Sequence, residues 1–264
     1  MKFSAFFVSV ALLFAVSSAR PSGLAARFSA HQGRTSRPLA NATNANITSL
    51  ASDNTEDLFS SNWAGGLLQS PPTGQHFTDI GGTFVVPTLE GPDGAMSAWI
   101  GIDGGPNAPQ SILQIGVDCY IVSGVNYNFA WFEWFPQNAF EITNLPVSPG
   151  NTITLRIQVE NNTTGIITLT NESTGLTVSG EVAAPNDDAA LQGNTAEWIV
   201  EDFEQNGELV PFASFGEVVF TDAAAFTGVE EVFASVGTAV DMEQDGLFLA
   251  ITTINENVVT VQYA

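Results

Sequence analysis

Basic residues are scarce in this 264-residue sequence, and nearly all of them lie in its first fifty positions. Residues 1–50 hold five of the six Lys and Arg residues and no acidic residue, whereas residues 51–264 hold all 28 acids and a single cation, Arg156. Phosphate backbones and anionic bilayers bind proteins through arrays of Lys and Arg. We therefore expect no nucleic acid and no membrane among the partners of the acidic part of the chain.

Cysteine and histidine are scarce too, which removes several kinds of catalytic site. The one cysteine, Cys119, cannot form an internal disulfide, so we expect it to be buried in a fold that its hydrophobic core stabilises. With two histidines and no Gly-x-Ser-x-Gly motif, a Ser-His-Asp triad is disfavoured. No His/Cys cluster has zinc spacing, and the acidic run 241–246 has Thr252 where an EF-hand needs glutamate. We expect neither a metal nor a cofactor.

Long hydrophobic runs are absent beyond the N-terminus. The apolar run at residues 6–16 is too short for a bilayer, which needs about 20 residues, and the small residues Ser17, Ser18 and Ala19 follow it. This pattern predicts a signal peptide over residues 1–19 and a secreted, extracellular protein. Sequons for N-glycosylation agree with a secreted glycoprotein and begin at Asn41, Asn46, Asn161, Asn162 and Asn171.

Residues 20–56 have the composition of a pro-segment. They are rich in Arg, Ser, Ala, Asn and Thr and show no apolar periodicity, so we expect them to be disordered. Their four arginines precede a strongly acidic body, and Coulomb attraction would hold the two parts together at neutral pH. We expect the pro-segment to inhibit a catalytic domain over residues 57–264. We hypothesise that the attraction falls as carboxylates protonate below about pH 4.

The body alternates apolar and polar residues with the period of β-strands, as at residues 152–160. Turn signals built on 24 Gly and 13 Pro separate the runs, and no segment keeps a helical period over three turns. This pattern predicts an all-β domain, a sandwich of two antiparallel sheets of the lectin-like or concanavalin-like kind. The other expected strands are 78–87, 96–103, 112–122, 127–135, 164–170, 175–182, 195–203, 216–221, 246–254 and 257–263.

Strand parity sorts the polar and aromatic side chains, because residues two apart in a strand share a face. Four of the expected strands each have one apolar face and one face with carboxylate, amide or indole groups. Large indoles are seldom left on a plain wet face, so we expect these polar faces to line a groove for an extended peptide or sugar. Trp134 and Trp198 fall on the core side, and the groove side holds Trp99, Asp103, Gln114, Asp118, Trp131, Glu133, Glu197 and Glu201.

Six blocks of sequence occur in a fixed order from about residue 58 to the C-terminus: Ser61–Gly66, Ala98–Gly104, Ile112–Asp118, Ala130–Pro136, Asn194–Glu204 and Val210–Phe215. Together they closely resemble the glutamic peptidases, or eqolisins, secreted mainly by filamentous fungi. The resemblance implies a two-sheet sandwich and cleavage of proteins at acid pH, without inhibition by pepstatin, through a Gln/Glu dyad. The dyad falls on Gln114 and Glu201, and the supporting groove residues fall on Trp99, Asp103, Asp118, Trp131 and Glu133.

The resemblance also implies a role for each dyad member. The Glu201 carboxylate would take a proton from water and later protonate the leaving nitrogen, and the Gln114 amide would position that water and donate to the oxyanion. Two alternatives stay open. One is a β-sandwich glycoside hydrolase using Glu133 and Glu201, about 5–5.5 Å apart if it is retaining; the other is a non-catalytic sugar-binding lectin. We expect a monomer that acts on polypeptide substrates.

Overall fold

The computed structural model describes residues 33–39, 43–44, 57–106 and 110–264. Strands make up nearly all of its regular structure, and the described helical segments are two single 3₁₀ turns, Asp187–Ala189 and Ala234–Val236. Within the described ranges, no helix has the length and apolar character needed to cross a membrane. The predicted all-β class is confirmed.

One sheet, called here the outer sheet, has the strand order β12, β11, β10, β5, β16 and β17, all antiparallel. Burial alternates along these strands, as at β11, because one face packs on the core and the other meets solvent. The strands are β5 (Asp79–Val85), β10 (Thr152–Asn161), β11 (Thr164–Asn171), β12 (Leu176–Ala183), β16 (Glu217–Phe226) and β17 (Glu231–Phe233).

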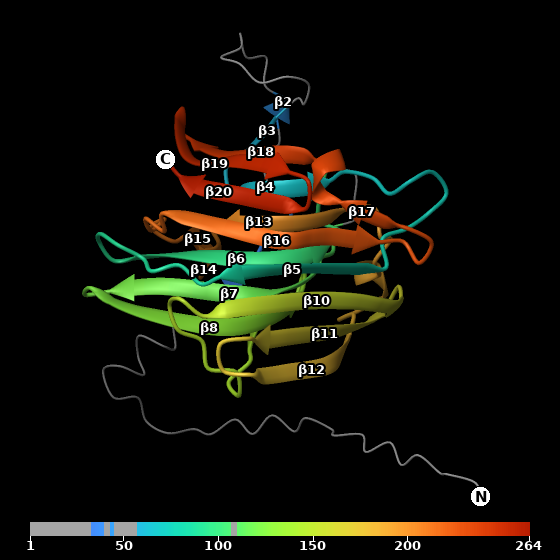
Figure 1. The fold of residues 1–264 in the computed structure, drawn as a ribbon, viewed down its shortest axis with the longest axis horizontal. Coiled ribbons are helices and arrows are strands. Elements are labelled where there is room, and N and C mark those ends of the chain that lie inside the picture. Colours follow the sequence, from blue (N-terminus) through green and yellow to red (C-terminus); the bar gives the residue numbers. More distant parts are fainter. Residues whose placement is uncertain (1–32, 40–42, 45–56, 107–109) are drawn as a thin grey trace, which may run out of the picture.

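The second sheet, called here the cleft sheet, has at its centre the strand order β8, β7, β6, β13, β4 and β18. Its strands are antiparallel except where β3 runs parallel to β18. They are β2 (Thr43–Asn44), β3 (Leu58–Ser60), β4 (Trp63–Leu68), β6 (Gly94–Ile102), β7 (Leu113–Val122), β8 (Val125–Trp134), β9 (Phe140–Glu141), β13 (Ala196–Glu201), β18 (Thr238–Gln244), β19 (Leu247–Asn255) and β20 (Val258–Tyr263). Figure 1 shows the strands of both sheets stacked from β12 at one end, past β18 and β19, to β3 and β2 at the other.

Strand β16 joins the two sheets. Residues 217–220 pair with β20 of the cleft sheet, and Thr221 onward pairs with β5 of the outer sheet. The register shifts between Thr221 and Ala224, and Asp222 has a φ of 53° at this irregularity. A bulge bends a strand in this way and lets it pass from one layer to the other.

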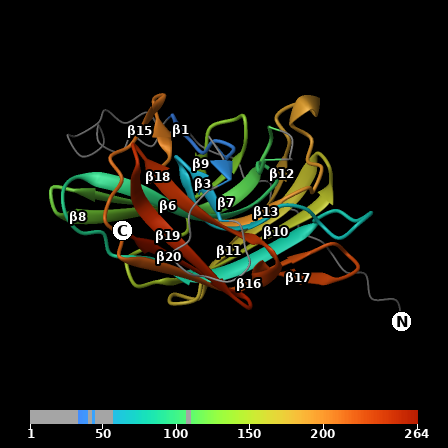
Figure 2. The same ribbon diagram turned by 90° about the horizontal axis from the view of Figure 1, so that it is seen from above.

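The main core lies between the two sheets. Trp134 and Trp198 are 1% and 0% exposed and belong to this core, which confirms the side predicted for them. Cys119 is also buried there as a free thiol, and burial raises the pKa of the thiol above its usual range. Figure 2 shows the two layers, with β1 and β15 on the side of the cleft sheet that faces away from the outer sheet.

The structure differs from the sequence expectations at several places. Neither β4 nor β18 was expected; all six residues of β4 are buried, so no alternation marks it. Residues 33–39 of the expected disordered segment are placed against the body. There β1 (Arg34–Thr35) pairs with β14 (Glu204–Gln205), which pairs in turn with β15 (Glu208–Leu209).

Candidate active site

The register of the cleft sheet puts the candidate residues into three rows across β13, β6, β7 and β8. Residues directly opposite one another in antiparallel strands point to the same face. The rows are Glu197, Gly101, Gln114 and Glu133; Ile199, Trp99, Gly116 and Trp131; and Glu201, Ser97, Asp118 and Phe129. Gln114 and Glu201 therefore lie on the same face of one sheet, together with Trp99, Asp118, Trp131 and Glu133.

A second, smaller apolar cluster covers this face. Trp63 and Trp99 meet edge to face at 4.9 Å between ring centroids, and both are fully buried. A glycine lets the Trp99 side chain lie flat on the sheet, because a Cβ at Gly116 would be 2.5 Å from the Trp99 Cβ. The cluster is Leu58, Trp63, Leu67, Trp99, Ile112, Trp131, Ile199 and Val240.

Residues 33–39, called here the plug, cross this face, and Arg34–Thr35 within them form strand β1. At one end the backbone N–H of Asn206 donates to the Gly33 carbonyl (3.3 Å), and at the other the Leu39 N–H donates to the Gly104 carbonyl (3.0 Å). Between them the Ala139 N–H donates to the Arg34 carbonyl (3.2 Å). The Leu39 side chain packs on the small apolar cluster. The groove therefore already holds a stretch of polypeptide.

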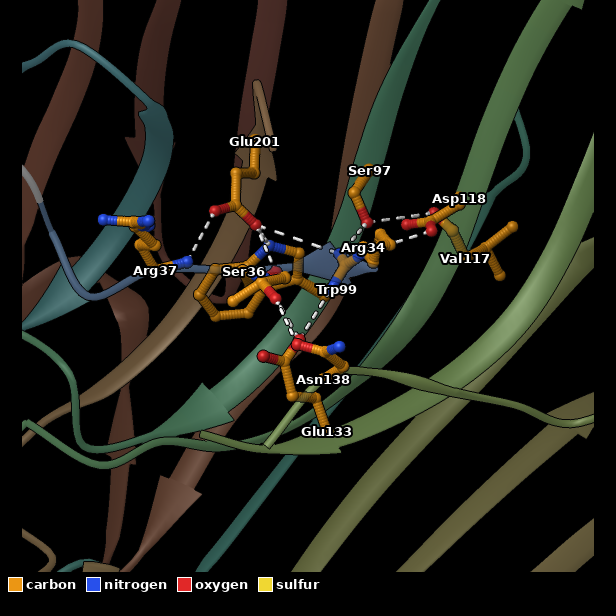
Figure 3. Close-up of polar contacts among 11 residues, drawn as sticks. Arg34, Ser36, Arg37, Ser97, Trp99, Val117, Asp118, Glu133, Asn138 and Glu201 are labelled. Carbon is orange, nitrogen blue, oxygen red and sulfur yellow. Dashed lines mark hydrogen bonds and ion pairs between the residues drawn. The ribbon is translucent and has the colours of Figure 1, made fainter. Parts of the chain in front are cut away.

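Arg34 of the plug is fully buried in a pocket of acidic side chains (Figure 3). Its guanidinium donates to Asp118 Oδ2 (3.0 Å), Glu133 Oε2 (2.8 Å) and Ser97 Oγ (3.1 Å). The guanidinium carbon lies 3.6 Å from the centroid of the Trp131 ring, a stacked cation–π geometry. A buried cation is stable only when it is paired and hydrogen-bonded, and this pocket supplies both.

Three donors converge on the carboxylate of Glu201, two of them from the plug. The Ser36 hydroxyl donates to Oε2, the Arg37 N–H donates to Oε1 (3.2 Å), and the Trp99 indole N–H donates to Oε2 (2.9 Å). A guanidinium nitrogen of Arg34 (Nη2) also lies 3.9 Å from Oε2 of Glu201. Both carboxylate oxygens of Glu201 thus accept hydrogen bonds while the plug is in place.

Ser36 also links the two glutamates of the groove, because its backbone N–H donates to Glu133 Oε2 (3.1 Å). Burial raises the pKa of Glu133 to about 8 and that of Glu201 to about 7, and the Arg34 guanidinium opposes both shifts. Burial lowers the pKa of Arg34, but its carboxylate partners outweigh burial and raise it overall. The two carboxyls and the guanidinium therefore form one buried, charge-coupled cluster.

Gln114 lies between Gly101 and Glu133 in its row and is fully buried. Among the described residues nothing hydrogen-bonds to its amide nitrogen or oxygen. Glu197 lies in the same row beyond Gly101, and burial together with the nearby Asp103 raises its pKa well above the usual range. Burial thus favours the protonated form of Glu197.

Asp103 follows β6 and has a different position from the other groove residues. Its carboxylate accepts the backbone N–H groups of Gln192 (2.6 Å), Gly193 (3.0 Å) and Asn194 (2.7 Å). Its φ of 69° turns the chain away from the strand direction that parity assumed. Asp103 thus anchors the loop before β13 and does not contact Arg34.

Three residues that matter in this site were not predicted from the sequence: Arg34, Ser36 and Trp63. The pro-segment arginines were noticed only as net charge, since nothing in their spacing selects Arg34.

In the described part of the chain, no group of three or more His, Cys, Asp or Glu residues is arranged to hold a metal ion. The acidic run 241–246 forms the β18–β19 hairpin, where Asp241 accepts the Thr252 N–H (2.7 Å).

Comparison with known proteins agrees with this geometry. Residues 61–263 match the model of the peptidase A4 family. The chain is 36% identical over 231 residues to aspergillopepsin-2 of Aspergillus niger, covering 79% of each chain. A crystal structure of scytalido-glutamic peptidase with a transition state analog inhibitor superposes with a TM-score of 0.70 at 32% identity, covering 77% of this chain and 98% of that one. The structure of aspergilloglutamic peptidase from Aspergillus niger gives 0.61 at 39% identity, covering 64% and 99%.

The family model spans most of the chain, and the relatives share both its sequence and its two-sheet fold. The resemblance seen in the six sequence blocks is confirmed, and a peptidase takes precedence over the glycoside hydrolase and the lectin. This chain belongs to the peptidase A4 family, the glutamic peptidases or eqolisins, and is a glutamic-type endopeptidase.

Proposed function

We propose that the chain is a secreted acid endopeptidase that hydrolyses peptide bonds with Gln114 and Glu201, and that the plug keeps it latent. The observation that carries the proposal is the plug itself: an extended polypeptide lies across the groove, on the face that holds both dyad residues. A groove that accommodates seven residues of peptide backbone suits a polypeptide substrate. Secretion rests on the expected signal peptide, which lies outside the described residues.

In the open groove, Glu201 acts as the general base. Its carboxylate takes a proton from the attacking water, and the same carboxyl later gives that proton to the leaving nitrogen. The unpaired Gln114 amide donates to the oxyanion, and it does so at any pH because a carboxamide does not titrate in this range. Glu133 lies on the same face, and burial raises its pKa to about 8, so it can hold a proton beside the base.

Acid pH suits this arrangement because the groove is crowded with carboxyl groups. At low pH the neutral forms of Glu133 and Glu197 avoid the repulsion that ionised neighbours would impose on Glu201. The Trp99 indole N–H donates to Glu201 and lowers its pKa, against the effect of burial. The proposed activity is therefore cleavage of proteins at low pH, without a metal or cofactor and without inhibition by pepstatin.

The plug inhibits by satisfying the catalytic carboxylate. The groups that it directs at Glu201 are donors, the Ser36 hydroxyl and the Arg37 N–H, and not a peptide carbonyl ready for attack. Arg34 holds the plug in place through Asp118 and Glu133, on the side of the groove where β7 and β8 lie. The bound plug therefore behaves as an inhibitor and not as a substrate.

The dyad is tested with Gln114→Ala and Glu201→Gln, using Glu197→Gln as the matched control on the same face of β13. Digestion of a denatured protein at about pH 3 in the presence of pepstatin should fall by about 10²–10⁴-fold in both dyad variants. The control should keep its activity, because burial favours the neutral form of Glu197 and glutamine is also neutral.

Thermal melts of all three variants show whether a loss of activity is a loss of fold. If activity survives Glu201→Gln but disappears in Glu197→Gln, the base is Glu197 and the proposed assignment to Glu201 is wrong. Cleavage of a glucan or xylan, with none of protein, would overturn the peptidase proposal as a whole.

A further inference from the structure

Three of the glycosylation sequons lie in the described part of the chain, within and beside the β10–β11 hairpin of the outer sheet. They begin at Asn161, Asn162 and Asn171, and their hydroxyl residues are Thr163, Thr164 and Ser173. The sequence alone does not distinguish the three sequons as candidate glycosylation sites. Glycosylation needs an asparagine whose side-chain nitrogen is accessible and whose surroundings leave room for a bulky, hydrated sugar.

Asn171 does not meet these requirements. Its side chain is fully buried, and its amide nitrogen donates to the Pro146 carbonyl (2.9 Å) and to Asn151 Oδ1 (2.9 Å). Both amide protons are therefore used inside the protein. A sugar on this nitrogen would replace one of these protons and would have to occupy the space between β11 and the loop at residues 146–151.

Asn161 is the last residue of β10, and its side chain is exposed where the hairpin turns. Its carboxamide oxygen accepts two hydrogen bonds from Thr163, one from the backbone N–H (3.0 Å) and one from the hydroxyl (3.0 Å). Both contacts involve the oxygen and not the nitrogen. Two donors on a carboxamide oxygen withdraw electron density from the nitrogen and make its proton easier to remove. The hydroxyl that the sequon requires is already bound to its own asparagine.

Asn162 is exposed as well, but its sequon is held differently. Its carbonyl accepts the Leu191 N–H (2.7 Å), which fixes the turn against the loop after the 3₁₀ turn Asp187–Ala189. Its partner Thr164 is the first residue of β11 and pairs with Asn161 on one side and Ala183 on the other. The threonine of this sequon is therefore part of the sheet and does not bond to Asn162.

We propose that Asn161 carries an N-linked glycan and that Asn171 remains unmodified. A bond forms between the Asn161 side-chain nitrogen and the anomeric carbon of an oligosaccharide, and the bond from that carbon to its lipid diphosphate carrier breaks. The amide nitrogen loses one proton to a base of the transferase, and the lipid diphosphate leaves. The contacts that favour Asn161 span three residues, so the turn can form before the sheet does, whereas a sugar on Asn171 would block later folding.

One peptide distinguishes the three sites. The full chain is secreted from a yeast and digested with a protease that cuts after glutamate. Cleavage after Glu160 and Glu172 releases residues 161–172, which contain all three asparagines. Enzymatic removal of the glycan in heavy-oxygen water converts the modified asparagine into labelled aspartate, and fragmentation locates the label. We expect the label at residue 161.

Matched variants complete the test. Thr163→Ala removes only the Asn161 sequon, so the label should disappear, while Thr164→Ala and Ser173→Ala should leave it unchanged. If Thr163→Ala is secreted poorly, Asn161→Gln replaces it. A label at residue 162 or 171, or a peptide with no label in the secreted wild-type chain, would overturn the proposal.

Discussion

We expect the substitution Arg34→Met to weaken the binding of the plug to the groove strongly. The Arg34 side chain is fully buried, makes hydrogen bonds to two carboxylates at 3.0 and 2.8 Å and stacks on Trp131 at 3.6 Å. Truncating one partner of a buried, hydrogen-bonded charge pair costs about 2–5 kcal/mol. Since 1.4 kcal/mol is tenfold in affinity, binding should weaken by at least about 30-fold.

The chain supplies its own control three residues later. Arg37 has the same charge and pairs with Glu204 at 2.7 Å, but its side chain is 56% exposed. Exposed ion pairs contribute about 0–1 kcal/mol, so Arg37→Met should weaken binding by no more than about fivefold. Net charge changes equally in the two variants, and therefore any difference between them reports the buried pocket.

The assay is a titration of the domain at residues 57–264 with peptides of residues 20–56, wild type, R34M and R37M. Tryptophan fluorescence reports binding directly, because Arg34 stacks on Trp131. The reasoning fails if R34M binds within fivefold of the wild-type peptide, or if R37M loses as much affinity as R34M. Either result would mean that general attraction between a basic segment and an acidic body holds the plug, without a specific pocket.

The same titration run against pH has a definite sign. Arg34 lowers the pKa of Glu133 and Glu201, so by linkage it binds their ionised forms more tightly than their protonated forms. The advantage of the wild-type peptide over R34M is therefore full above the higher pKa values that the two carboxyls have without Arg34, and it is lost as the pH falls through their values of about 8 and 7 beside Arg34. This window lies above the pH of about 4 expected for exposed carboxylates. An advantage that grows on acidification would contradict the assignment.

Three further predictions concern the groove and the stability of the domain. Ser36→Ala removes one donor from the Glu201 carboxylate, so the peptide should bind about tenfold more weakly in the same titration. Trp99→Phe removes the indole donor that lowers the pKa of Glu201, so the acid limb of the pH–activity profile should move to higher pH; an unmoved limb contradicts the contact. Burial raises the pKa of Asp202 to about 7 and of Asp241 to about 6, so the folded state holds these protons where the unfolded chain releases them near pH 4. Stability should therefore fall by about 1.4 kcal/mol per pH unit for each group as the pH rises from 4 to 6, and melts of Asp202→Asn and Asp241→Asn should show a flatter dependence.

Much of the fold could be predicted because burial has the period of the strands. Alternation located β10 and β11, and parity assigned Trp134 and Trp198 to the core and Glu133 and Glu201 to the groove. Strand β4 was not predicted from the sequence, and the reason is physical. Both of its faces are covered and it contains two glycines at a close approach, where a Cβ on Gly65 would lie 2.0 Å from the Trp198 carbonyl oxygen. A strand buried on both sides has no alternation to detect.

The contacts of the plug were not predicted from the sequence, for a different reason. Its backbone bonds run to Gly104, Ala139 and Asn206, which are distant in sequence, and its key side chain is charged and yet buried. A local sequence pattern detects the apolar surface that a segment can bury, and residues 33–39 have little apolar surface. Their partner is a pocket that exists only after β6, β7 and β8 have assembled.

Burial of carboxyl groups therefore serves two states of one groove. With the plug in place, Arg34 and the Ser36 hydroxyl satisfy carboxylates that would be costly to leave ionised and unpaired beneath a peptide. Without the plug, the same groups are exposed to water and to substrate, and at low pH protonation takes the place of the cation in neutralising buried carboxyls. Glu201, the proposed base, is also the residue that the plug caps with two donors. A segment that latches through the neighbours of the base and caps the base itself can block catalysis without altering a single catalytic side chain.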